Sequence, residues 1–76
     1  MSNKLPSLSG KEIIKALSKI GFQPIRQKGS HVILLKETPT KKRTTIVPLH
    51  KEVDKDTLIE IIRQAGLKKE EFQKLL

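Results

Sequence analysis

Apolar residues near the N-terminus of the chain recur at the spacing of one buried helix face. They lie three or four positions apart, the period of an amphipathic helix, and comprise Ile13, Ile14, Leu17 and Ile20. Ser9 and Glu12 have the spacing of a capping box, in which each residue satisfies a free backbone N–H of the other. The helix is therefore expected to begin near Gly10 and to end at Gly21.

The pattern then changes to short runs that are typical of strands. The expected strands are an edge strand at 22–28, a central strand at 31–36 and a third strand at 43–49. Pro24 cannot donate a ladder hydrogen bond, which favours an edge position for the first strand. The second run is apolar on both faces, as in a central strand. Gly29 and Ser30 form the first turn, and residues 38–42 form the second loop.

The last third of the chain returns to helical spacing. Asp54 is a good N-cap for a second helix that reaches about Ala65 and ends at Gly66, and residues 68–76 predict a short third helix. The buried face of the second helix would carry Leu58, Ile61, Ile62 and Ala65.

This order predicts an α+β fold, an α-β-β-β-α two-layer sandwich with a short C-terminal helix. Both long helices should cover one sheet face and leave the other face to a partner. We expect an extended lead at residues 1–8 and a single domain at residues 9–76, because a chain of 76 residues cannot divide its apolar side chains between two cores.

The net charge of the chain indicates which kind of partner it binds. Sixteen Lys and Arg against eight Asp and Glu give a net charge of +8 and a pI near 10.1, which favours a polyanionic partner over a merely soluble basic surface. The basic segments contain no aromatic residue, so contact with backbone phosphates is a better interpretation than base stacking. No apolar run suits a membrane span or a secretion signal, which predicts a cytoplasmic protein.

Three lysines on the first helix, Lys11, Lys15 and Lys19, recur at a spacing of four residues. Their ordinary role is a solvated helix face. Like charges at this spacing mildly destabilise a helix, so the row has a second interpretation as a contact for phosphates.

Few residues could carry catalysis. The chain has no Cys, and no pair of carboxylates has a spacing suggestive of acid–base work or a metal site, so no metal and no cofactor is expected. His31 could be a strand residue satisfied by a backbone carbonyl. Arg26 and Lys28 lie just upstream, however, and Gly29 lets a phosphate approach the backbone. An imidazole beside an RNA phosphodiester could deprotonate the 2′-hydroxyl or protonate the leaving 5′-oxygen.

His50 is a possible second histidine. It follows the third expected strand, whose end lies near the start of the second strand in an antiparallel meander, so His50 could approach His31. The alternative is a histidine in a surface loop.

Several segments together resemble the HicA family of toxins from prokaryotic toxin–antitoxin pairs. They span residues 10 to 76 and comprise Gly10-Lys11-Glu12, Gly21-Phe22, Gln27-Lys28-Gly29-Ser30-His31, Val47-Pro48-Leu49-His50, Gln64-Ala65-Gly66-Leu67 and Glu70-Glu71-Phe72. The resemblance implies a fold like that of double-stranded-RNA-binding domains, cleavage of mRNA and neutralisation by a HicB-like antitoxin. It implies that His31 is the catalytic histidine and that Gly29 and Ser30 are the small residues before it.

The chain departs from the family pattern at two places. Residues 38–43 are longer and more basic than the tight turn typical of the family. The second helix begins with Glu52, Asp54 and Asp56, where double-stranded-RNA-binding domains carry lysines that grip phosphates. We therefore expect the fold to be retained without that duplex-gripping contact.

The leading hypothesis is a metal-independent endoribonuclease toxin with His31 as general acid or base. Gly29 and Ser30 would shape the phosphate approach, and the RNA backbone would be held by Arg26, Lys28, Lys41, Lys42 and Arg43. The alternatives are a non-catalytic RNA-binding module of the same fold and a basic docking surface for an acidic protein.

Overall fold

The computed structural model describes residues 5–76, and the order of its elements confirms the predicted α-β-β-β-α layout with a C-terminal helix. In chain order they are α1 (Gly10–Ser18), β1 (Gln23–Lys28), β2 (His31–Glu37), β3 (Lys42–Pro48), α2 (Lys55–Gln64) and α3 (Lys69–Gln73). Residues 1–4 of the expected lead lie outside the described residues.

The three strands form one antiparallel sheet in the order β1-β2-β3, so the apolar run that begins at His31 is the central strand, as predicted. β1 is an edge strand whose register shifts between Pro24 and Arg26, which leaves Ile25 as an extra residue in a bulge. The turn between β1 and β2 has Gly29 at φ 60°, a left-handed conformation that glycine adopts without steric cost.

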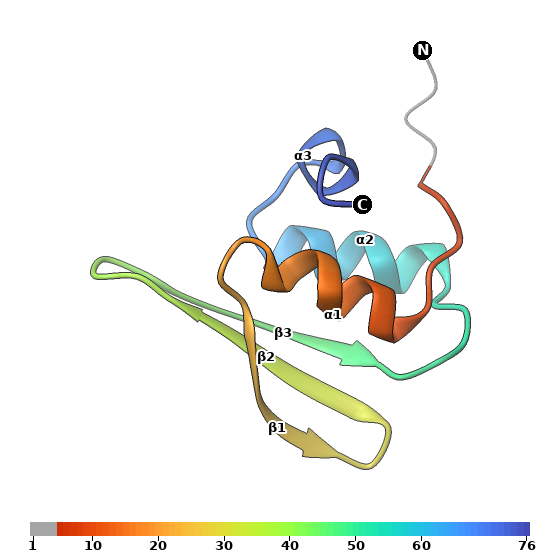
Figure 1. Cartoon of the computed structure of the whole chain (residues 1–76), viewed down its shortest axis with the longest axis horizontal. Helices are drawn as coiled ribbons and strands as arrows, with labels where there is room; N and C mark the ends of the chain where they lie inside the picture. The colour runs from red at the N-terminus through yellow and green to blue at the C-terminus, as the bar shows by residue number, and fades with distance from the viewer. Residues whose placement is uncertain (1–4) are drawn as a thin grey trace.

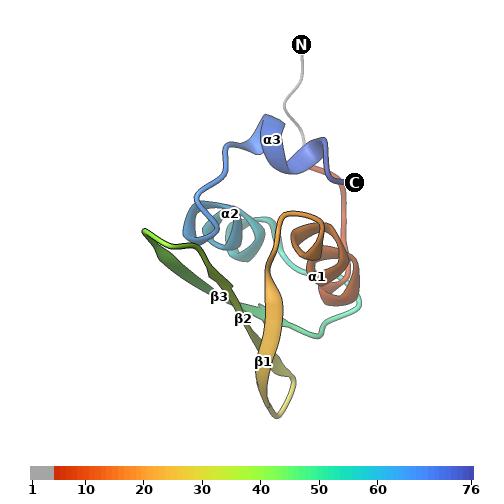
Figure 2. The ribbon, with the colours of Figure 1, turned by 60° about the vertical axis from the view of Figure 1, so that its left-hand side comes forward.

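The two long helices lie together on one face of the sheet, and α3 lies beyond them (Figures 1 and 2). Alternate strand residues, among them Val32, Leu34 and Val47, point into the core between the layers. Thr45 is buried with them, and its Oγ1 donates to Gln64 Oε1 on α2 at 2.8 Å. The β2–β3 hairpin extends past the helices and is the part of the sheet at the left of Figure 1.

Both predicted N-caps are formed. Ser9 and Glu12 make a reciprocal capping box, in which Ser9 N donates to Glu12 Oε1 at 2.9 Å and Glu12 N donates to Ser9 Oγ at 3.1 Å. Asp54 caps α2 by accepting from Thr57 N at 3.2 Å and from Thr57 Oγ1 at 2.7 Å. These bonds satisfy backbone donors that the helix itself leaves free.

The described part of the lead contributes to the core. Leu5 and Leu8 are buried, and Val53 N donates to Leu8 O at 2.8 Å in a short antiparallel bridge just before α2. Residues 5–8 therefore pack as part of the domain. None of the helices formed by residues 5–76 has the length and apolar character needed to cross a membrane.

Candidate functional site

The sheet face opposite the helices, which we call the open face, carries the predicted catalytic histidine. In an antiparallel sheet, residues paired across strands share a face, so the register gives the open face row by row. From one end to the other, the rows are Lys28, His31 and Pro48; Arg26, Ile33 and Ile46; Gln23, Leu35 and Thr44; and Glu37 and Lys42.

His31 is the first residue of β2, and its side chain is exposed at one end of the open face. Lys28 pairs with it on β1, Pro48 pairs with it on β3, and Arg26 occupies the next row. The structure thus brings together three of the residues predicted from the sequence, one imidazole and two cations, on a surface that no helix within residues 5–76 covers.

The turn before His31 is held by hydrogen bonds that the sequence did not reveal. Gln27 Nε2 donates to Gly29 O at 3.0 Å, and Leu49 N donates to Ser30 O at 2.6 Å. A Cβ atom at Gly29 would meet no atom of the described part of the chain within 4 Å, so one side of this turn is open. The turn is therefore held by a side chain of β1 and by the residue that follows β3, and it still leaves room for a ligand. In the sequence, the position of Gln27 two residues before Gly29 is the only indication that its side-chain amide could hold this turn.

His50 lies beyond the residue that pairs with His31. Pro48 is the partner of His31 in the sheet, and the His50 carbonyl accepts from Gly10 N at 3.0 Å at the start of α1. The charge of His50 also acts on Asp54, which caps α2. His50 is exposed, its carbonyl is bonded to the first residue of α1, and its charge acts on the N-cap residue of α2.

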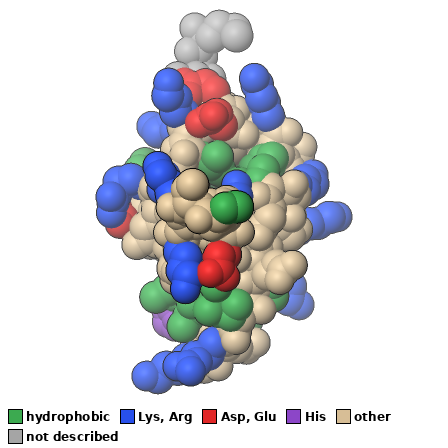
Figure 3. Space-filling model, turned by 90° about the vertical axis from the view of Figure 1, so that its left-hand side faces the viewer, with side chains coloured by type: hydrophobic (Ala, Val, Ile, Leu, Met, Phe, Trp, Pro, Cys, Tyr) green, Lys and Arg blue, Asp and Glu red, His purple; other side chains and the backbone are tan. Residues whose placement is uncertain are grey.

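The middle of the open face is apolar. Ile33 and Leu35 are half-buried, and Ile46 keeps 49% of its surface exposed; Ile25, in the bulge of the edge strand, keeps 58%. Figure 3 shows hydrophobic side chains gathered in the lower part of that view, with a histidine beside them and Lys or Arg side chains at the margin. The apolar character of both faces of β2 was the sequence signal for this surface.

The basic residues of the second hairpin lie at the far end of the sheet from His31. Lys42 pairs with Glu37 in the sheet, and its Nζ lies 3.5 Å from Glu37 Oε2. Lys41 belongs to the adjoining turn, where its backbone bonds with Thr38 close the hairpin. His31 and Glu37 are the two ends of β2, about 20 Å apart at ~3.3 Å per residue.

Arg43 is placed differently from its two neighbours. It pairs with Lys36 on the helix side of the sheet, and its guanidinium atoms lie 2.5 to 2.7 Å from the position that a Cβ on Gly66 would occupy. Aliphatic carbons of the Lys36 side chain lie 3.7 to 3.9 Å from the corresponding position on Gly21. Gly66 follows the C-terminal end of α2, where the helix dipole favours a cation such as Arg43. Arg43 therefore lies on the opposite side of the sheet from His31.

The acidic start of α2 is engaged within the protein. The hydrogen bonds from the Thr57 side chain and backbone lower the pKa of Asp54 below its ordinary value of 3.8, and the charge of His50 acts in the same direction. Glu52 Oε2 accepts from Ser7 Oγ at 3.3 Å. Asp54 and Glu52 thus both have partners within the protein at this end of the helix layer.

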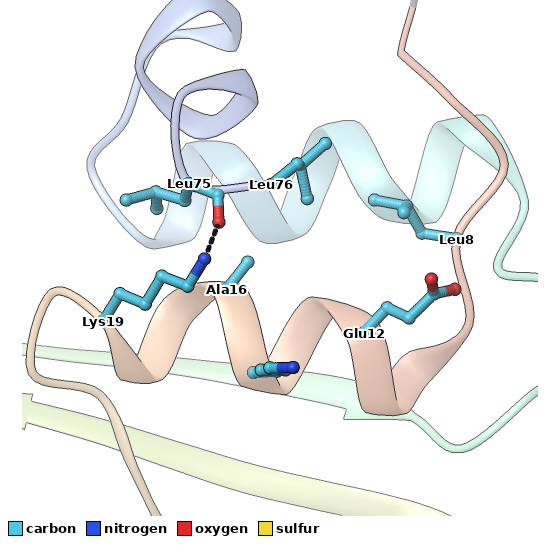
Figure 4. A pocket seen from close by; sticks show the side chains of 7 residues that line it. Leu8, Glu12, Ala16, Lys19, Leu75 and Leu76 are labelled. Atoms are coloured by element: carbon cyan, nitrogen blue, oxygen red, sulfur yellow. Dashed lines mark hydrogen bonds between the residues drawn. The ribbon is translucent and has the colours of Figure 1, made fainter.

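The helix layer contains a separate shallow pocket of about 240 Å³ between α1 and the C-terminus. Figure 4 shows Lys19 Nζ donating to Leu75 O, at 2.6 Å, along one side of this pocket. Its other lining residues are Leu8, Glu12, Lys15, Ala16 and Leu76, and none belongs to the open face. One lysine of the predicted row thus has a partner inside the protein. Across residues 5–76, no three His, Asp or Glu side chains gather in a group suited to a metal ion.

The fold and the open face define a small basic α+β protein with an exposed histidine beside cations on an uncovered sheet. The family model described as "HicA toxin of bacterial toxin-antitoxin" matches residues 10–67, which contain the whole sheet and both long helices. The chain belongs to the HicA toxin family and is the toxin of a toxin–antitoxin system. No curated protein matches the chain.

Proposed function

We propose that this toxin is an endoribonuclease that cleaves mRNA in the cytoplasm without a metal ion. The observation that carries the proposal is the exposed His31 at the end of the central strand, next to Lys28 and Arg26 on the sheet face opposite the helices of the described residues. Family membership supports it, because it makes the chain a toxin with an antitoxin. The same face suits a polyanionic substrate, whose phosphates the two cations can contact.

RNA contains its own nucleophile, so a single imidazole beside the scissile phosphate can accelerate cleavage. The 2′-oxygen attacks the adjacent phosphorus while the bond from phosphorus to the 5′-oxygen breaks. The products are a 2′,3′-cyclic phosphate and a free 5′-hydroxyl. His31 acts by removing the 2′-hydroxyl proton or by giving a proton to the leaving 5′-oxygen, and such transfers contribute about 10²- to 10⁴-fold.

The residues around His31 have separate tasks in this proposal. Lys28 and Arg26 hold the charged backbone of the RNA, as cations on the same face. Gly29 and Ser30 form the turn along which a phosphate approaches, since the space beside Gly29 is empty and its backbone is held by Gln27. Lys41 and Lys42 hold RNA farther along the sheet, whereas Arg43 supports the end of α2 and stays off the RNA.

The test is cleavage of RNA by the purified toxin in excess EDTA, with wild type compared with His31→Ala. We expect the wild type to cleave and the variant to lose at least about 10²-fold in rate. Lys11→Ala is the matched control, because Lys11 is also exposed but belongs to the helix layer. Circular dichroism should show that all three proteins are folded. Full cleavage by His31→Ala would disprove the assignment, and salt-dependent RNA binding without cleavage by the wild type would favour the non-catalytic alternative.

We further propose that a HicB-like antitoxin neutralises the toxin by covering His31. Exposed Ile46 and half-buried Ile33 give such a partner an apolar surface next to the histidine, with cations at its margin for acidic side chains. Adding a purified HicB-like antitoxin that binds this toxin should abolish RNA cleavage. Persistent cleavage by the purified complex would contradict occlusion of the site.

A further inference from the structure

The two ends of the open face are cationic, and the middle is apolar. Arg26 and Lys28 lie near His31, whereas Lys42 and the adjoining Lys41 lie at the other end of the sheet. About 20 Å of strand separates the two ends. The second cationic end therefore cannot touch the phosphate that is cleaved at His31, and its partner must be a long anion or a second one.

A single RNA strand fits this arrangement better than a duplex does. Its phosphates can meet the cations at the two ends, while its bases lie over the apolar side chains between them, Ile33, Leu35 and Ile46. A duplex keeps its bases paired and stacked inside and so offers no base faces to these apolar side chains, and the acidic start of α2 is unsuited to phosphates. Charge and surface character thus point to the same ligand.

We infer that the open face binds one single-stranded RNA segment that runs from His31 to Lys41 and Lys42. At ~3.4 Å per nucleotide for a stacked strand, the distance corresponds to about six nucleotides on one side of the cleaved bond. A more extended strand covers it with fewer nucleotides. The inference rests on the proposed function for the position of cleavage, but the binding footprint can be measured by itself.

The hairpin divides its basic residues between two tasks. Lys42 is on the open face and Lys41 is in the exposed turn, so both can reach RNA. Arg43, the next residue, is on the helix side against Gly66 and takes no part in the footprint. Glu37 lies beside Lys42 and opposes the binding of a phosphate there.

The test measures binding of fluorescein-labelled 2′-O-methyl oligouridylates by fluorescence anisotropy with the full-length toxin. The 2′-O-methyl group removes the nucleophile, so the wild-type protein can be used without cleavage. Oligomers from about four to about twelve nucleotides cover the range of single-strand binding sites of small domains. We expect affinity to rise steeply up to about six to eight nucleotides and then to level off.

The double variant Lys41→Gln/Lys42→Gln should lose the gain in affinity that the longer oligomers give. For a single strand, each phosphate contact adds about 0.7 to the slope of log affinity against log salt concentration. Between 1 M and ~0.1 M salt, one contact therefore raises affinity about fivefold, and each lost lysine should remove a factor of this size at ~0.1 M salt. The matched control is Lys11→Gln/Lys15→Gln, which removes the same charge from α1 and should bind like the wild type. Glu37→Gln should bind long oligomers more tightly, because it removes the negative charge beside Lys42.

Three results would overturn the inference. The first is an affinity of the wild type that does not depend on oligomer length, and the second is an equal loss of affinity in the α1 control. The third is binding of a poly-glutamate peptide that is as tight as binding of RNA and depends equally on Lys41 and Lys42. The last result would indicate an acidic protein partner. Cleavage of unmodified RNA in EDTA, measured in parallel, separates this inference from the proposed function, because cleavage can be present without the footprint and the footprint without cleavage.

Discussion

Gly10→Ala is the substitution for which sequence and tertiary structure predict opposite effects. Gly10 is the first residue of α1, it is buried, and its N–H donates to His50 O at 3.0 Å. A Cβ at this position would overlap Pro48 O and would lie 2.9 Å from Pro48 C and 3.0 Å from Leu49 Cα. All three are backbone atoms, so no side-chain rotation relieves the contact, and α1 must move away from the end of β3.

The size of the effect follows from the opposing contributions. Helix propensity alone favours Ala over Gly by up to about 1 kcal/mol. Overpacking of a close contact costs about 1–3 kcal/mol, and weakening the bond to His50 adds about 1 kcal/mol. We therefore expect the free energy of unfolding to fall by about 1–3 kcal/mol. For a domain of this size each 1 kcal/mol lowers Tm by about 4–8 °C.

Unfolding in guanidinium chloride, followed by circular dichroism, measures this change, and thermal unfolding gives Tm. Gly29→Ala is the matched control, since a Cβ there meets nothing within 4 Å and the only cost is the left-handed φ of 60°. That cost is about 1–2 kcal/mol. A Gly10→Ala protein as stable as the wild type, or more stable, would refute the close contact between α1 and the end of β3.

Three further predictions concern the core, the helix cap and the second histidine. Thr45→Val should lower the free energy of unfolding by about 1 kcal/mol, because it removes the bond to Gln64; an unchanged denaturation midpoint would contradict this. Asp54→Ala should destabilise the protein at neutral pH. Since the folded-state pKa of Asp54 lies below its ordinary 3.8, this stabilisation is present above that value and is lost as the pH falls through the lowered pKa, so wild type and variant should converge in acid unfolding curves. Finally, His50→Gln should cleave RNA within about tenfold of the wild-type rate, because Pro48 rather than His50 is paired with His31. A loss as large as that of His31→Ala would show that the two histidines act together.

The helix starts, the strand order and the first turn could be predicted because each depends on neighbours in the chain. The capping box of Ser9 and Glu12 and the N-cap at Asp54 form within one helical turn. The turn at Gly29 needs a positive φ, and glycine supplies it. The strand boundaries shifted by only one residue, since β3 begins at Lys42 rather than at residue 43.

The hairpin shows what the sequence could not provide. Lys41, Lys42 and Arg43 were predicted together as RNA contacts, but consecutive strand residues point to opposite faces, so the register decides which of them shares a face with His31. Pairing of Glu37 with Lys42 places Lys42 on the open face and Arg43 against the end of α2. The role of all three residues in binding RNA stays a prediction, and our proposal assigns it to Lys41 and Lys42 alone.

Local patterns were enough to predict the elements, the basic character of the protein and the histidine at the start of the central strand, because caps, turns and periodicity involve neighbouring residues. The strand register, in contrast, places Lys28 and Arg26 on the same face as His31, and Lys42 about 20 Å away on that face. The packing of α1 against the end of β3 likewise leaves no room for a side chain at Gly10. These features depend on strand register and on the approach of layers that are far apart in the chain.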